Sequence, residues 1–149
     1  MFKSSVTVVA IASSTLLVSS HSFGADRLGY SLVPTDKAVF FPVDPKYPDG
    51  IKISVVSGDP EKGPAAYLLK LPKGVVPNHW HTGEYYAVLV AGAQKHWLAS
   101  SADHGNDNSA GSTWVQPAGE AFAEGDECMT DSCTIFAFSP NGIGFRVAK

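Results

Sequence analysis

Two histidines separated by one residue, His79 and His81 in the stretch PNHWHTGEYYAVLVAG, are the first candidates for chemistry. Side chains two positions apart on an extended strand point to the same face, so both imidazoles can reach a single ion. Structural zinc sites use four protein ligands, and catalytic sites usually use three together with an open position. The sequence therefore predicts half of a metal site, and the other ligands must come from elsewhere in the chain.

Two nearby side chains are candidates to complete this site. A β-bulge at Gly83 would turn Glu84 toward the face of the two histidines, whereas an uninterrupted strand would aim it at the opposite face. His96 lies on the next expected strand and could reach the histidines as a cross-strand neighbour. Without a third ligand, His79 and His81 would line a polar pocket that holds no metal, and this alternative stays open.

The two cysteines, Cys128 and Cys133, are separated by four residues that suit a hairpin turn. In an oxidising compartment an even number of nearby cysteines indicates a disulfide, and a bridge across so short a loop adds about 2 kcal/mol of stability. A metal-thiolate role is the weaker interpretation, because this spacing is not typical of zinc sites.

The first 25 residues have the layout of a secretory signal peptide. Lys3 precedes an apolar run from Val6 to Val18, and small residues follow as far as Ala25. We expect cleavage between Ser20 and Ala25 and a periplasmic or secreted location. Because the apolar run is too short for a stable bilayer span, we expect no membrane span after processing.

The remaining chain, residues 26–149, has the length of one domain. Without Lys3 it carries ten basic and 14 acidic side chains, a formal net charge of −4. No cluster of lysine or arginine interrupts this mild acidity, so the composition argues against nucleic acids and anionic membrane surfaces as partners.

Short runs typical of strands fill this segment, and no amphipathic helix is evident. Ile51, Ile53 and Val55 alternate with Lys52 and Ser54, which is the period of a strand with one buried face. About eight such runs in a small domain predict an all-β antiparallel sandwich or barrel with a hollow for ligands. The runs are 38–43, 51–58, 65–72, 84–92, 94–100, 112–118, 133–139 and 143–147.

Two longer stretches resemble the motifs of the cupin superfamily. The run HWHTGEYYAVLVAG, preceded by Gly74, resembles the first cupin motif, and GSTWVQPAGEAF, from Gly111 to Phe122, resembles the second. Together with the cysteine pair, these runs look like a subgroup of small cupins of uncharacterised function. The resemblance implies a single cupin-type antiparallel β-barrel, a jelly-roll-like double sheet.

The departures from the cupin motifs concern the metal ligands. The position of the family's glutamate is Tyr85, and the position of its third histidine is Phe122. Both aromatic residues are therefore expected to form walls of a pocket, with Tyr85 as a candidate proton donor. Glu120 and Glu124 lie two residues on either side of Phe122, and either could replace the lost histidine if that segment is extended.

Three functions are compatible with these residues. The first is an exported small-molecule-binding barrel with a partly eroded metal site. The second is a metal-dependent cupin enzyme of the oxygenase or isomerase type, using His79 and His81 with Glu84 or His96. The third is a structural or interaction module, since cupins often form homodimers through strand edges. The cofactor would be one divalent ion of iron, zinc, manganese, nickel or copper, or none.

Overall fold

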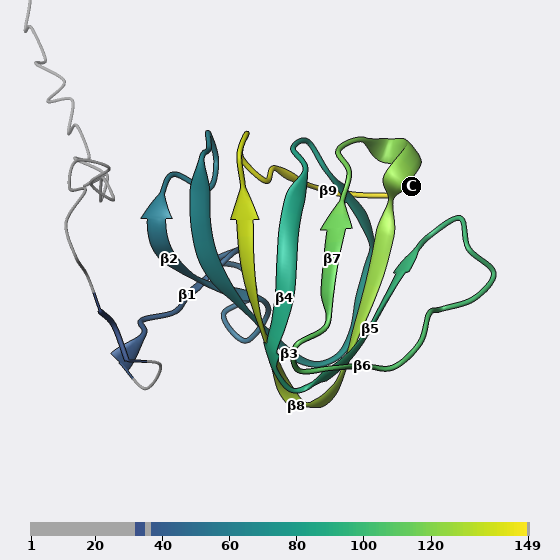
Figure 1. Ribbon diagram of the computed structural model, residues 1–149, viewed down its shortest axis with the longest axis horizontal. Helices are drawn as coiled ribbons and strands as arrows, with labels where there is room; N and C mark the ends of the chain where they lie inside the picture. Colours follow the sequence, from purple (N-terminus) through teal and green to yellow (C-terminus); the bar gives the residue numbers. More distant parts are fainter. Residues whose placement is uncertain (1–31, 35–36, 149) are drawn as a thin grey trace, which may run out of the picture.

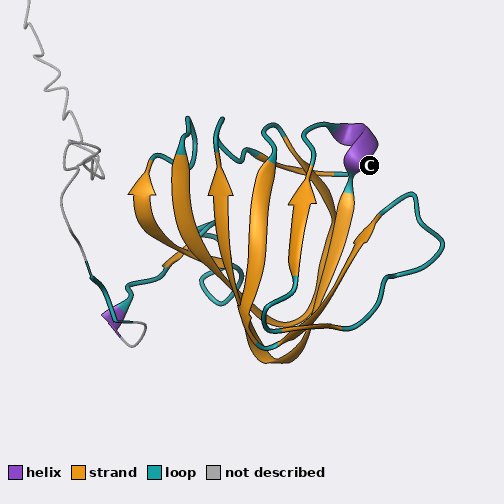
Figure 2. Cartoon of the chain, viewed as in Figure 1, coloured by secondary structure: helices purple, strands orange, loops and turns teal. Residues whose placement is uncertain are grey.

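A computed structural model gives the fold and describes residues 32–34 and 37–148 (Figures 1 and 2). The predicted signal peptide, residues 1–25, lies outside the described residues. Within them the chain forms strands and short 3-10 turns, with no α-helix, as the sequence predicts. No helix in this described part is long and apolar enough to cross a membrane. The strands are β1 (Phe41–Pro42), β2 (Lys52–Gly58), β3 (Ala65–His81), β4 (Tyr85–Ala91), β5 (Ala93–Leu98), β6 (Asn108–Ser109), β7 (Thr113–Gln116), β8 (Glu124–Ser139) and β9 (Phe145–Val147).

The barrel is built around one long antiparallel ribbon formed by β3 and β8. The ribbon bends at the bottom of the view in Figure 1, so its two halves lie in different layers. The half with residues 65–72 and 132–139 pairs with β2 and β4, and β4 pairs with β7. The half with residues 74–81 and 124–128 pairs with β9 and β5. Two layers that share their central strands therefore face each other across the interior.

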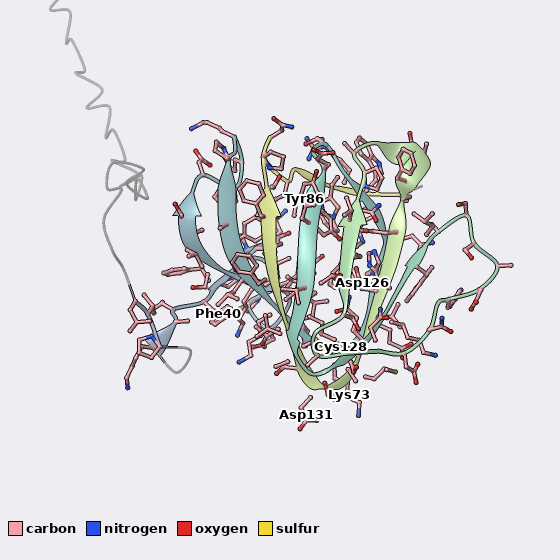
Figure 3. The ribbon with its side chains drawn as sticks, viewed as in Figure 1. Phe40, Lys73, Tyr86, Asp126, Cys128 and Asp131 are labelled. Atoms are coloured by element: carbon pink, nitrogen blue, oxygen red, sulfur yellow. A yellow bond between two sulfur atoms is a disulfide. The ribbon has the colours of Figure 1, made fainter. Side chains whose placement is uncertain are left out.

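The disulfide between Cys128 and Cys133 lies at this bend. The predicted pairing is present, but the expected hairpin turn is wrong, because β8 bends through both cysteines without folding back to pair with itself and stays paired with β3 on either side. The register explains the difference: Pro72 pairs with Ser132 while Gly74 pairs with Cys128, so the residues between the cysteines form a bulge. Figure 3 shows Cys128, Lys73 and Asp131 together at this end of the barrel.

The apolar core lies on the inner faces of both layers. Tyr67, Leu89 and Ala137 are fully buried there, and they come from β3, β4 and β8. Each lies on a strand that alternates between buried and more exposed positions, which is the pattern of a sheet with one face toward the interior. The polar residues of the candidate site lie on the same inner surface.

We predict that replacing both cysteines by serine lowers the free energy of unfolding by about 2 kcal/mol, because the unfolded chain regains the entropy of a short closed loop. Urea unfolding followed by tryptophan fluorescence measures this difference. Adding a reductant to the unmodified protein should reproduce it. An unchanged free energy in both cases would contradict a stabilising disulfide at the bend.

Candidate metal centre

Three neighbouring strands bring five polar side chains to one inner face. His79 and His81 alternate with Trp80 on β3, and Glu124 and Asp126 alternate with Gly125 on β8. His79 lies directly opposite Glu124 in the β3–β8 pairing, and His96 of β5 lies opposite Asp126. Residues that face each other across neighbouring strands share a side of the sheet, so the pairing itself assembles the cluster.

Glu124 is at the centre of the cluster, and it has no exposed surface. Its Oε1 atom lies 3.0 Å from Nε2 of His81 and 3.3 Å from Nε2 of His79. From the opposite layer, the Tyr85 hydroxyl donates a hydrogen bond of 2.8 Å to the same oxygen. The Trp114 indole in turn donates to the Tyr85 oxygen at 3.2 Å, which fixes the hydroxyl in place.

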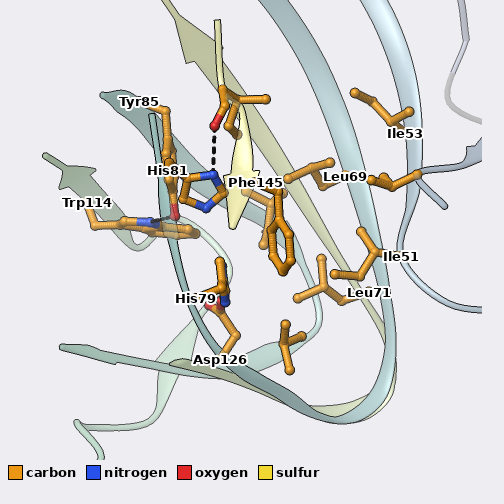
Figure 4. Close-up of a pocket in the computed structure, with 14 residues that line it drawn as sticks. Ile51, Ile53, Leu69, Leu71, His79, His81, Tyr85, Trp114, Asp126 and Phe145 are labelled. Atoms are coloured by element: carbon orange, nitrogen blue, oxygen red, sulfur yellow. Dashed lines mark hydrogen bonds and ion pairs between the residues drawn. The ribbon is translucent and has the colours of Figure 1, made fainter. Parts of the chain in front are cut away.

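The other ring nitrogens of the two β3 histidines are held by backbone carbonyls. Nδ1 of His79 contacts the Pro77 carbonyl and Nδ1 of His81 contacts the Ile143 carbonyl, both at 2.9 Å, the latter drawn as a dashed line in Figure 4. A carbonyl only accepts hydrogen bonds, so each Nδ1 carries a proton, and a ring in its neutral form presents a lone pair at Nε2. Two lone pairs and a carboxylate oxygen therefore converge, an arrangement that needs protons or a metal ion between them.

His96 contacts the other carboxylate oxygen of Glu124, the one that does not face His79 and His81. Its Nδ1 donates to Oδ1 of Asp126 at 2.9 Å, and its Nε2 lies 3.2 Å from Oε2 of Glu124. The amide of Gln94 also donates to Oδ1 of Asp126, at 2.7 Å. Oε2 of Glu124 is buried without a hydrogen bond, so His96 meets it only as a close electrostatic contact.

The distances fit a single metal ion. Ligand atoms of His79, His81 and Glu124 all lie within 4.8 Å of one another, and all three side chains are buried. Two ligand atoms about 2.1 Å from an ion, with bond angles of 90–110°, are about 3.0–3.4 Å apart. The distances from Oε1 of Glu124 to the two Nε2 atoms fall in this range. His96 lies outside this set of three, so its contacts favour a role in orienting Glu124.

Burial and pairing act in opposite directions on the pKa values of these groups. Burial alone would raise the pKa of Glu124, but the contacts with His79 and His81 outweigh it and lower the value to about 2. Burial would lower the pKa of His79 and of His96, but the carboxylates of Glu124 and Asp126 raise both above the usual value. The cluster therefore holds Glu124 ionised and attracts positive charge.

The arrangement of strands agrees with known structures. The structure is similar to KdgF from Halomonas sp., with 25% identity, a TM-score of 0.55, and coverage of 74% of this chain and 95% of that one. It is also similar to an RmlC-like cupin from Ralstonia eutropha, with 20% identity, a TM-score of 0.57, and coverage of 76% and 69%. The chain has the cupin fold. The polyketide cyclase RemF from Streptomyces resistomycificus has the same fold at 14% identity, with a TM-score of 0.63 over 80% of this chain and 85% of that one. No protein-family model and no curated protein matches the sequence.

The second cupin motif differs from the sequence-based expectation in one turn. Residues Glu120–Phe122 form a 3-10 turn after Gly119, so extended structure begins again only at Glu124. Phe122 is 42% exposed and does not line the inner cavity, which corrects its expected role as a pocket wall. Glu124 instead points inward, two residues beyond the expected histidine position, while Glu120 remains in the turn outside the cluster.

Glu84 does not join the cluster. Residues 82–84 link β3 to β4 without a bulge in a ladder, and β4 begins at Tyr85, whose side chain is buried. Alternation along the strand then places Glu84 on the other side, where its carboxylate accepts a 3.4 Å hydrogen bond from the exposed Tyr86. Gly83 has a different role, because a Cβ there would lie 1.9 Å from the Gly142 carbonyl oxygen.

Asp126 and Gln94 are members of this cluster that the sequence alone did not indicate. Asp126 is 6% exposed and Gln94 is fully buried. The spacing of Glu124, Asp126 and Cys128 matches one face of a strand, and this is the signal in the sequence. Gly125 obscured it, because a glycine beside acidic residues is more typical of a turn.

The pKa directions predict how the metal-free protein responds to pH. The lowered pKa of Glu124 stabilises the fold above about pH 4.5, and this contribution is lost as the pH falls toward 2. The raised pKa values of His79 and His96 stabilise it below about pH 6.5, and this contribution is lost as the pH rises through their folded-state values. We expect the cluster to contribute most between these limits.

The test is thermal unfolding of EDTA-treated protein and its Glu124→Gln variant from pH 5 to 9. Glu124→Gln should lower Tm most at pH 5–6, and the difference should shrink above pH 8, where uncharged imidazoles no longer compensate the carboxylate. Glu84→Gln is the matched control and should show no such pH dependence. A constant effect of Glu124→Gln across the range would contradict the described charge pairing.

Proposed function

We propose that this cupin binds one divalent transition-metal ion through His79, His81 and Glu124 and presents it to a small organic molecule in the barrel. The convergence of two Nε2 atoms on Oε1 of a fully buried carboxylate is the observation that carries this proposal. Both imidazoles are oriented by hydrogen bonds at Nδ1, as metal-binding histidines generally are.

The donor set favours ferrous iron among the candidate ions. Two imidazoles and one carboxylate with open coordination positions are typical of non-haem iron sites, although manganese, nickel, zinc and copper accept similar ligands. A bound ion of this kind supplies Lewis acidity and can activate oxygen. The neighbouring apolar cavity, in contact with His79, His81 and Tyr85, is where an organic molecule would meet it.

Tyr85 is the candidate proton donor of the site. Burial, followed by the nearby negative charge of Glu124, raises the pKa of its hydroxyl well above the usual value, so the group stays protonated at neutral pH. The hydroxyl lies on the cavity side of Glu124 and between two hydrogen-bond partners. We propose that its single O–H orients Glu124 in the resting site and turns to donate a hydrogen bond to an oxygen atom of the bound molecule once Glu124 holds the metal ion.

The other two functions receive less support. A metal-free binding barrel would need protonated histidines to compensate Glu124, and the raised pKa of His79 makes this the second candidate. An interaction module without a ligand would be expected to fill its interior with aromatic side chains. Phe122 lies outside, and a cavity remains beside Trp114 and Tyr85, which argues against that function. Homodimer formation stays a prediction.

We also propose export, on the basis of the N-terminal signal sequence. The disulfide between Cys128 and Cys133 supports a final location in an oxidising compartment, either the periplasm or the external medium.

The metal proposal predicts near-stoichiometric metal in the purified mature protein, measured by elemental mass spectrometry without a histidine tag. His79→Ala, His81→Ala and Glu124→Gln should each reduce bound metal by at least tenfold, because each removes one of three ligands. Glu84→Gln and His104→Ala are controls that change an acid and a histidine outside the cluster, and both should retain the metal. Equal metal content in all five variants, or none after incubation with each candidate ion, would contradict the proposal.

The export proposal predicts that the mature protein lacks about 20–25 N-terminal residues, because signal peptides of this layout are removed on export. Intact mass spectrometry of protein from the periplasm or medium of a bacterial host measures this directly. The mass should correspond to cleavage between Ser20 and Ala25. Full-length protein retained in the cytoplasm would contradict export.

A further inference from the structure

The cavity beside the metal centre is small. Its volume is about 100 Å³, whereas sites for organic ligands usually measure about 300–1,000 Å³. It therefore accommodates only the head of most organic molecules, and the rest of such a molecule must extend outward. Its wall opposite the histidines is aliphatic, formed in part by Ile51, Ile53, Leu69, Leu71, Ile135 and Ile143.

A second cavity adjoins the first. Its volume is about 500 Å³, and the two share Val43, Ile51, Val76 and Phe145 as lining residues. The outer cavity, here called the outer groove, runs between the 43–51 segment, residues 72–77 of β3 and the strand β9. Its lining includes the apolar side chains of Val43, Tyr47, Val75, Val76, Phe145 and Val147.

Phe145 stands at the junction of the two cavities. Its ring stacks on the ring of His79, with centroids 4.6 Å apart and an interplanar angle of 25°, and it remains 39% exposed. Figure 4 shows it between the histidines on one side and Leu69, Leu71 and Ile51 on the other. A molecule that reaches the metal centre from the outer groove must therefore pass along this ring.

The lining also limits the charge of a ligand. The inner cavity has no lysine or arginine among its lining residues, and it already contains Asp126 beside the histidines. The outer groove has one lysine, Lys73, and one acid, Asp44, so neither sign of charge dominates. Val75 and Val147 are each 64% exposed in the groove, which leaves apolar surface that an uncharged chain would cover.

From these observations we infer that the ligand is an elongated molecule with a small oxygen-bearing head and an uncharged apolar tail. The head occupies the inner cavity, the tail lies in the outer groove, and Phe145 determines how wide the molecule is where the two meet. The head-group part of this inference rests on the proposed metal-dependent function, whereas the tail part depends only on the groove. The tail is therefore tested without relying on the metal site.

The tail is tested by displacement of the neutral fluorescent probe N-phenyl-1-naphthylamine with straight-chain alcohols from butanol to decanol. Each methylene that enters an apolar groove should raise affinity by up to about fourfold, until the groove is full. Metal-free and metal-loaded protein should both show this dependence. Affinity independent of chain length in both forms would overturn the inference, even if the metal site is confirmed.

Variants identify the surface that binds the tail. Val75→Asp places a charge in the outer groove. It should weaken the binding of the longest alcohols at least tenfold and have little effect on the binding of butanol. Phe122→Ala, which changes an exposed aromatic residue outside both cavities, is the control and should have no effect. Circular dichroism and metal content of the same variants show that the barrel and the metal centre are unchanged. Equal effects of Val75→Asp on short and long alcohols would overturn the assignment of the tail.

Phe145→Ala tests the junction. Removing the ring should shift selectivity several-fold from n-octanol toward 2-cyclohexylethanol, which has the same number of carbons but is wider near its head. An unchanged ratio of the two affinities would exclude Phe145 as a determinant of ligand width.

A second copy of the chain is the competing occupant of the groove, and light scattering on the Val75→Asp variant tests it. A change in oligomeric state without a change in probe binding would show that the groove is an interface between copies, and the inference would be wrong.

Discussion

Glu124 is a carboxylate without exposed surface, and the need to compensate its charge determines the arrangement of the barrel interior. A buried charge is tolerated only where it is paired and hydrogen-bonded. Here the partners come from three strands around a carboxylate of β8: two imidazoles of β3, one imidazole of β5 and the Tyr85 hydroxyl of β4. The two layers of the barrel must therefore remain in register for the cluster to form.

The bent ribbon of β3 and β8 gives this register. The half with residues 65–72 and 132–139 carries most of the apolar core. The half with residues 74–81 and 124–128 presents alternate polar side chains to the same interior. At the bend, the disulfide closes the bulge in β8 four residues after Glu124. The barrel thus combines an apolar half, which supplies most of the burial energy, with a polar half in which each charged group has an oriented partner.

The fold and part of the site were predictable from local sequence. Alternation within short runs predicted the strands, and the spacing of His79 and His81 predicted that they share a face. The beginning of β8 was not predictable, because Gly125 and Asp126 favour turns when the chain is considered alone. In the structure Gly125 is extended because it pairs with Trp97 of β5, and a Cβ there would lie 2.4 Å from the Trp97 ring.

The length of one turn determines which side chain becomes the third candidate ligand. An uninterrupted strand after Gly119 would have turned Phe122 inward, but the 3-10 turn delays the strand by two residues and brings Glu124 to the interior. Such a turn depends on contacts distant in sequence, among them the hydrogen bond from the Gln116 amide to the Phe122 carbonyl. The position of Phe145 is also a tertiary result, since β9 pairs only with the end of β3 among the described strands.

The most direct test of a metal centre at Glu124 is anomalous X-ray diffraction from crystals of the mature protein soaked with manganese or cobalt. A metal ion held by this cluster should give a single anomalous peak within about 2.3 Å of Nε2 of His79, Nε2 of His81 and Oε1 of Glu124. A peak elsewhere on the surface, or an empty cluster in which the imidazoles remain in direct contact with the carboxylate, would contradict it.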